Sequence, residues 1–172
     1  MSELSELASA KVEAERVKLL ASLPAKIEAL KRKNAANGLL RSGNTILGVV
    51  AICSSALDSL GRVVLEQYRW AVAQSLLTTQ SWVEELIRTV PDQLLPLYER
   101  CVDHVKREAD LAGVPRAAPE CIAKLEVKRD EVVNDITLSL RASFAERKRG
   151  FVRNLGSTAL GWLSKLFGGV KP

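Results

Sequence analysis

Apolar residues recur at steps of three and four along most of this chain, a spacing that gathers them on one face of an α-helix. Residues 3–33 follow this pattern. Pro24 predicts a kink or restart within the first helix, because proline lacks an amide donor and crowds the preceding turn. Gly38, which follows a basic last turn, predicts where the helix stops.

Residues 44–79 form the second predicted helix, with Asn44 and Thr45 as candidate N-caps. Apolar residues surround every side of its first half, and the 16 residues of 42–57 carry no charge. That length is short of the about 20 apolar residues that a membrane-spanning helix needs. Two interpretations of 42–57 stay open: the buried central helix of a bundle, or a segment that enters a membrane.

The middle of the chain contains several helix-ending signals. A capping-box pattern at 81–84 predicts a short helix over 82–90, ended by Pro91. A further helix is predicted over 92–112. Glycine and two prolines in 113–119 predict a linker after it.

The next predicted helix, 120–149, has a narrow apolar stripe flanked by charged residues. Such a stripe is typical of one helix of a bundle and also resembles a coiled-coil seam. Only eight residues of the chain are aromatic, so aliphatic side chains must fill the core, as suits helix-on-helix packing. We therefore expect an all-α fold: an irregular bundle of four to six helices over residues 1–150, followed by an amphipathic C-terminal helix at 151–172.

The last 22 residues divide sharply into two faces. When they are placed on an α-helix, nearly all large apolar side chains occupy one half and the polar residues the other. Left in water, that half would expose an apolar patch on the order of several hundred Å². The candidate membrane- or partner-binding residues are Phe151, Leu155, Trp162, Leu163, Leu166 and Phe167.

Three interpretations remain for what covers this apolar face. The helix could fold back on its own bundle, lie in a membrane interface, or dock on a protein partner or second copy of the chain. Trp162 near the edge of the face suits a membrane interface, where an amphipathic ring reaches the polar boundary.

Charge is distributed unevenly along the chain, whose net charge is +5. Residues 1–140 hold 18 basic and 19 acidic side chains, whereas residues 141–172 hold seven basic side chains and one acid. This asymmetry favours an anionic partner such as a lipid surface or nucleic acid. A solvated basic helix end is the simpler interpretation of the run at 147–149. The candidate anionic-surface-binding residues are Arg147, Lys148, Arg149 and Arg153.

Catalytic and metal-binding patterns are not found in the sequence. The single histidine, His104, is expected to lie exposed among charged residues, off the apolar face of its helix. Cys53, Cys101 and Cys121 are widely spaced and match no metal or redox motif, so we expect free thiols in a reducing cytoplasm. The acidic N-terminus does not resemble a secretory signal. We expect no catalytic residues, no metal, no cofactor and no small-molecule substrate.

The sequence therefore predicts a non-enzymatic, cytoplasmic helical protein. We expect it to associate with a membrane surface, as a peripheral membrane protein, or with a protein partner, including a homo-oligomer, through its C-terminal helix. The alternative is a nucleic-acid-binding protein that uses basic clusters at 26–41 and 147–153. No aromatic residue lies within the first cluster to stack on bases, which makes nucleic acid the weaker alternative.

Overall fold

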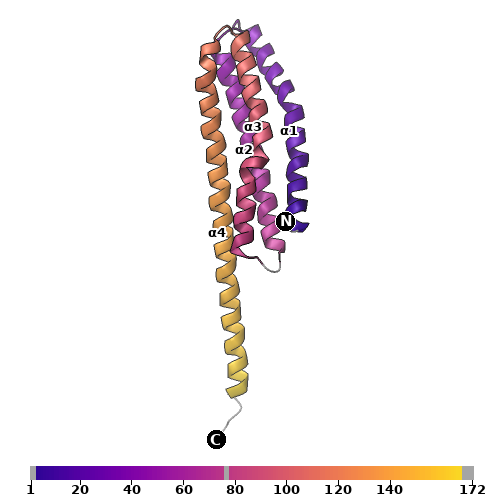
Figure 1. Cartoon of the computed structure of the whole chain (residues 1–172), viewed down its shortest axis with the longest axis vertical. Coiled ribbons are helices and arrows are strands. Elements are labelled where there is room, and N and C mark those ends of the chain that lie inside the picture. The colour runs from indigo at the N-terminus through magenta and orange to yellow at the C-terminus, as the bar shows by residue number, and fades with distance from the viewer. Residues whose placement is uncertain (1–2, 76–77, 168–172) are drawn as a thin grey trace.

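The described part of the protein is a bundle of four long α-helices (Figure 1). The computed structural model describes residues 3–75 and 78–167, and their side chains up to residue 149. No strand occurs within these ranges. The all-α prediction and the expected number of helices are thus confirmed. The elements are α1 (Glu3–Ala36), α2 (Gly43–Gln74), α3 (Gln80–Leu111), the 3₁₀ turn η1 (Pro115–Ala117) and α4 (Ala118–Phe167).

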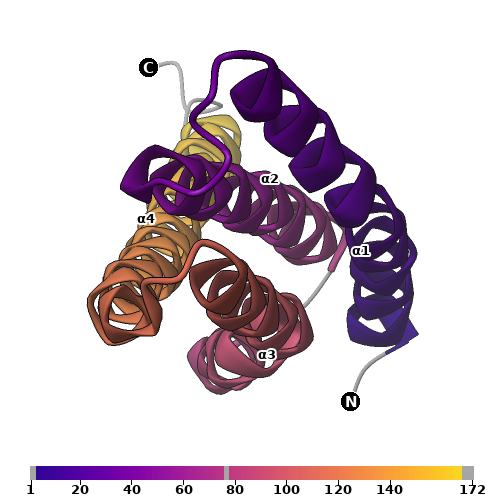
Figure 2. The ribbon, with the colours of Figure 1, turned by 90° about the horizontal axis from the view of Figure 1, so that it is seen from above.

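The helices run alternately up and down, and α2 lies between α1 and α4 (Figure 2). Helix α3 packs against both α2 and α4 and makes a smaller contact with α1. In the described part of the chain, α1 and α4 do not pack against one another. This order makes α2 a central helix, which explains the apolar residues that its first half buries, while Leu47 stays 50% exposed.

Helix α2 is long and apolar enough to cross a membrane, judged by length and composition alone, and is the one described helix that is. The buried core helix of a soluble protein meets the same criterion. Here α2 contributes Ile46, Val49, Cys53 and Leu57 to the common core of the bundle. Its position is therefore that of the central bundle helix, the first of the two interpretations of residues 42–57.

Close approach of the helices depends on small residues at their contacts. A Cβ atom at Gly61 of α2 would overlap the Val132 side chain of α4. At Gly48 it would lie 2.7 Å from Leu30 of α1. Both glycines let a neighbouring branched side chain fit against the α2 backbone.

The predicted division of α3 into helices 82–90 and 92–112 is wrong, because α3 is continuous through Pro91 and Pro96. Buried apolar residues on both sides of the prolines, including Leu86, Val90 and Leu94, hold the helix against its neighbours. That packing offsets the hydrogen bond lost at each proline. The same holds in α1, which continues through Pro24.

The predicted capping box is also wrong by two residues. Thr79 is the N-cap of α3, and its Oγ1 accepts a hydrogen bond from the Trp82 amide at 3.3 Å. Ser81 lies inside the helix. Threonine is also a favoured N-cap residue, because its hydroxyl satisfies an otherwise unpaired amide of the first turn.

Of the predicted linker 113–119, residues 113–117 form a tight turn that pairs α3 with α4, and residues 118 and 119 already belong to α4. Gly113 has φ of 75°, and the Val114 amide donates to the Ala109 carbonyl at 3.0 Å, which closes the end of α3. Helix α4 starts at Ala118 and continues without a break past residue 150. Its last part extends beyond the ends of the other three helices (Figure 1).

Candidate functional site

Arg147 lies where α4 passes the C-terminal end of α2. Its guanidinium donates from Nη1 to the Val72 carbonyl and from Nη2 to the Ser75 carbonyl. These carbonyls belong to the last turn and the C-cap of α2, which have no partners within their own helix. A positive charge at this position also offsets the negative end of the α2 dipole. Arg147 therefore joins α4 to the end of α2.

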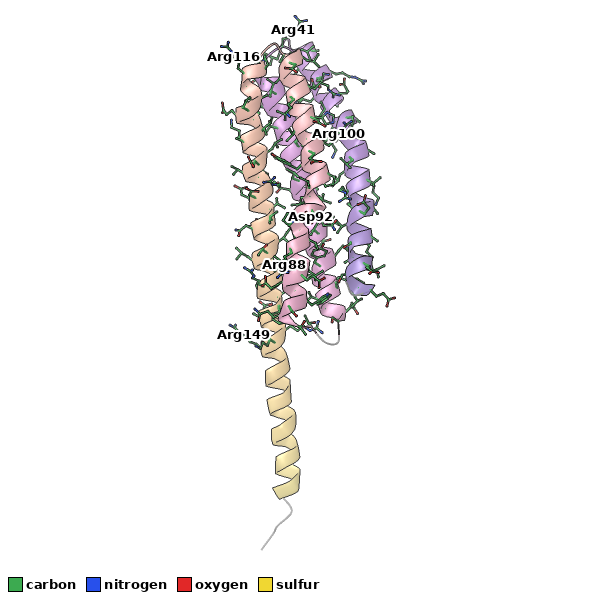
Figure 3. The ribbon with its side chains drawn as sticks, viewed as in Figure 1. Arg41, Arg88, Asp92, Arg100, Arg116 and Arg149 are labelled. Carbon is green, nitrogen blue, oxygen red and sulfur yellow. The ribbon has the colours of Figure 1, made fainter. Side chains whose placement is uncertain are left out.

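Lys148 and Arg149 differ from Arg147 in being exposed on the same turn of α4. Arg149 is near the point where α4 leaves the bundle and points away from it (Figure 3). Of the four predicted anionic-surface residues, these two are thus available to a partner. The side chain of Arg153 lies outside the described residues.

The predicted apolar contact residues also have side chains outside the described part of the structure. They are Phe151, Leu155, Trp162, Leu163, Leu166 and Phe167, and their backbone belongs to α4. The sequence pattern assigns them to one face, and the fold places their backbone beyond the bundle (Figure 1).

An open hollow of about 560 Å³ lies beside Arg147, between α2 and α4, and its lining residues include Arg69, Ser143 and Glu146. The Ser143 hydroxyl donates to the Ser139 carbonyl at 2.8 Å and accepts from Arg69 Nε at 3.1 Å. A serine nucleophile needs a general base that accepts its proton. The group beside the Ser143 hydroxyl is the Arg69 guanidinium, which only donates hydrogen bonds, so this serine is not activated as a nucleophile.

A buried polar cluster between α1 and α3 was missed by the sequence analysis. His104, predicted to be exposed, is 2% exposed, and so is Glu108. The signal was present in the spacing, because the two residues follow the buried Cys101 by three and seven positions and so share its helix face. Their polarity argued against burial, but α3 has neighbours on three sides and buries a wide face.

Glu108 is the centre of this cluster. Its carboxylate is 3.3 Å from Lys31 Nζ of α1 and 3.3 Å from Arg107 Nη2. Hydrogen bonds to Glu28 and Glu108 raise the pKa of Lys31, against the opposing effect of its own burial. Two cations therefore compensate the one buried carboxylate, as a charge in a protein interior requires.

His104 is neutral in this arrangement. Arg107 Nη2 lies 3.0 Å from His104 Nδ1, and since a guanidinium only donates, Nδ1 accepts and Nε2 carries the proton. Among the described residues no hydrogen-bond partner faces Nε2. Burial, followed by repulsion from Arg107 and Arg100, lowers the pKa of His104.

Cys53 of α2 and Cys101 of α3 are brought together in the core, a pairing that their spacing in sequence did not indicate. Both are free and fully buried. A hydrogen bond with Cys53, and then burial, raises the pKa of the Cys101 thiol far above its usual range. A protonated thiol is a poor nucleophile, so Cys101 is chemically inert in the folded protein. In the parts of the chain described, no three metal-binding side chains form a group.

The two basic clusters of the nucleic-acid hypothesis lie at opposite ends of the bundle. Arg41 and Arg149 mark these ends in Figure 3. The 32 residues of α2 span the distance between the ends, which is about 48 Å at 1.5 Å per residue. The clusters therefore do not form one continuous basic stripe.

Comparison with protein-family models, curated proteins and solved structures finds no match for this chain.

Proposed function

We propose that this protein binds an anionic membrane surface through the amphipathic C-terminal part of α4, and that it has no catalytic role. The observation that carries the proposal is the extension of α4 beyond the bundle (Figure 1). Among the residues that the structure describes, no other helix lies beside this part of α4 to cover its apolar face. An interfacial lipid layer covers such a face along its full length.

The charge at the start of the extension supports the same proposal. Lys148 and Arg149 are exposed there, and the sequence adds Arg153 one turn further on. Basic residues beside an amphipathic helix are attracted to anionic headgroups, at about 1 kcal/mol for each charge near the surface. The six candidate contact residues within 151–167 supply the insertion, and each fully buried side chain contributes about 1.5–3 kcal/mol before ordering costs.

Nucleic acid is the less favoured partner. Binding along a duplex or a single strand benefits from a continuous basic surface, whereas the clusters at 26–41 and 147–153 are separated by the length of the bundle. Docking of the extension on a second copy of the chain is the stronger competitor, because it would bury the same apolar face.

Vesicle sedimentation of the full chain tests the proposal. The protein should pellet with phosphatidylcholine vesicles that contain phosphatidylglycerol and much less with pure phosphatidylcholine. The double substitution W162D/L166D should abolish pelleting, because a charge on the apolar face opposes insertion. The matched control is S157D/S164D, which adds the same charges to the polar face of the same helix and should bind far better.

Light scattering of the same proteins separates lipid from self-association. If wild type is monomeric and only W162D/L166D loses vesicle binding, lipid is the partner. If wild type is an oligomer that W162D/L166D dissociates, and wild type does not pellet with vesicles, the extension docks on its own copies and the proposal is wrong.

A further inference from the structure

The end of the bundle opposite the α4 extension is formed by two turns. Residues 37–42 connect α1 with α2, and residues 112–117 connect α3 with α4. Both turns lie at the top of the molecule in Figure 1 and are viewed from above in Figure 2. We call this surface the loop end. No residue of it belongs to the predicted C-terminal contact site.

Large apolar side chains concentrate at the loop end. Leu39, Leu40 and Val114 are 39%, 39% and 40% exposed in the two turns, and Leu111, 57% exposed, ends α3 beside them. A single exposed apolar residue needs no explanation. Three of them in two adjacent turns, where polar residues are the usual choice, with Leu111 directly before the second turn, are a feature to be explained.

The backbone of the first turn is held in a defined conformation. The Leu39 amide donates to the Asn34 carbonyl at 2.8 Å, and the Leu39 carbonyl accepts from Ser42 Oγ at 2.6 Å and from Thr45 Oγ1 at 2.9 Å. Asn34 Nδ2 also donates to Thr45 Oγ1 at 2.9 Å. The turn therefore presents Leu39 and Leu40 at fixed positions on the end of the bundle.

Exposed cations lie at the same end of the bundle as these apolar residues. Lys33, Arg41 and Arg116 are exposed, and none of them forms an ion pair with any residue whose side chain is described. Figure 3 shows Arg41 and Arg116 at the same end of the molecule, pointing away from it. Unpaired cations beside outward-facing leucines match the two layers of an anionic bilayer surface, with headgroups outside and acyl chains beneath.

We propose that the loop end is a second lipid-contacting surface, in which Leu39, Leu40 and Val114 insert into an anionic bilayer while Lys33, Arg41 and Arg116 contact its headgroups. A stable protein interface needs about 800 Å² from each partner, whereas shallow insertion of a few side chains into lipid needs no such area. Lipid contact at the loop end does not depend on the proposed function of the α4 extension.

A consequence follows when both ends bind lipid, and this consequence does rest on the proposed function. The loop end and the extension lie at opposite ends of α4, whose 50 residues are about 75 Å long. One molecule would then hold two anionic membranes together. Vesicles mixed with the full chain should cluster.

Site-specific fluorescence in the full chain tests the loop end directly. A cysteine introduced by Leu40→Cys is labelled with an environment-sensitive nitrobenzoxadiazole dye, while the native cysteines, all buried, stay unlabelled. The matched control is Leu95→Cys, because Leu95 is 41% exposed but lies midway along α3, one turn from Asp92 (Figure 3). With phosphatidylglycerol vesicles, the dye at position 40 should brighten at least twofold with a blue shift, and the dye at position 95 should not.

The same experiment identifies the outcomes that would overturn the inference. A silent dye at position 40, while the protein pellets with the vesicles, would show that only the extension binds lipid. An equal response at positions 40 and 95 would show nonspecific adsorption. A blue-shifted dye at position 40 without vesicles, in a protein that light scattering shows to be dimeric, would show that a second copy covers the loop end.

Clustering provides a second measurement with two independent variants. Dynamic light scattering should show at least a tenfold loss of vesicle clustering for L39S/L40S and for R41Q/R116Q, while sedimentation still shows binding through the extension. Circular dichroism confirms that each variant remains helical. Unchanged clustering by both variants would overturn the inference. Failure of the proposed function is distinguishable, because W162D/L166D would then still pellet as wild type does.

Discussion

The ammonium group of Lys31 on α1 lies 3.3 Å from the carboxylate of Glu108 on α3, whose side chain is 2% exposed. Seventy-seven residues separate the two in sequence. This pair connects α1 with α3, which pack only weakly on one another because α1 packs mainly against α2, and α3 against α2 and α4. The loss of stability when this pair is removed should therefore measure its contribution to the packing of α1 on the bundle.

Lys31→Met should lower the free energy of unfolding by about 1–3 kcal/mol, because it leaves Glu108 buried with Arg107 as its remaining cation. The control is Lys18→Met, which breaks the exposed pair with Glu15 and should cost well under about 1 kcal/mol. Urea unfolding followed by circular dichroism measures both. Equal effects would contradict a special role for the buried pair, and the double variant K31M/E108Q should recover part of the loss.

Stability should depend on His104 in mildly acidic solution. Burial, then Arg107 and Arg100, lowers the pKa of His104 below its ordinary 6.5, against the smaller effects of Glu108 and Asp103. Below pH 6.5 His104 binds a proton in the unfolded chain but not yet in the folded chain, so the free energy of unfolding falls as pH falls. It stops falling once pH passes the lowered pKa of the folded state.

One proton limits that slope to about 1.4 kcal/mol per pH unit. Wild type and His104→Gln should therefore differ in slope between pH 6.5 and pH 5, with the variant nearly flat. Hydrogen bonds to basic partners lower the pKa values of Glu28, Glu84 and Glu120 from 4.5, so their own losses of stability appear only at lower pH. Urea unfolding across this range measures the slopes, and parallel curves for both proteins would disprove the assignment.

Gly61→Ala should destabilise the bundle by about 1–3 kcal/mol, because the added methyl overlaps Val132 and forces α2 and α4 apart. The control is Gly43→Ala in the first turn of α2, where nothing lies within 4 Å of the new atom. That change should be neutral or stabilising by up to about 1 kcal/mol. Thermal unfolding compares them, and the double variant G61A/V132A should recover part of the loss if the overlap is the cause.

Substitutions of Arg147 and Arg149, which lie within one turn of α4, should have different effects on stability. Arg147→Gln removes the donors to the last carbonyls of α2 and should cost about 1–2 kcal/mol of stability, with faster amide exchange in the last turn of α2. Arg149→Gln should leave stability within about 0.5 kcal/mol of wild type. A stability loss of the same size in both variants would contradict the assignment.

Vesicle affinity should depend on Lys148 and Arg149 rather than on Arg147, the reverse of the order expected for stability. Lys148→Gln with Arg149→Gln should weaken binding to phosphatidylglycerol vesicles by about 2 kcal/mol, or about 30-fold, if lipid is the partner. Arg147→Gln should change vesicle affinity much less, because its charge already faces the end of α2. Sedimentation at several lipid concentrations measures these affinities. A normal affinity for the Lys148 and Arg149 variant would count against an electrostatic contribution.

Helix content was predictable from the chain because it depends on local periodicity. The helix ends near Gly38 and Gly113 were also predictable from local sequence, because the backbone there has a positive φ, which glycine adopts readily. The continuity of α3 through Pro91 was not predictable from local sequence, because a proline within a helix destabilises it. Only the packing of Leu86, Val90 and Leu94 against the neighbouring helices offsets that cost. Sequence reasoning weighs the local penalty without knowing what the neighbouring helices contribute.

The sequence by itself determined that this protein is helical and that its surplus of basic residues lies at the C-terminal end, and it predicts that the last residues divide into two faces on a helix. Each of these follows from residue order along one helix. Only the tertiary structure decided that His104 and Glu108 are buried, that Cys53 meets Cys101, and that Arg147 joins α4 to the end of α2. Those facts depend on which faces meet and in what register, and many weak contacts between distant segments determine both.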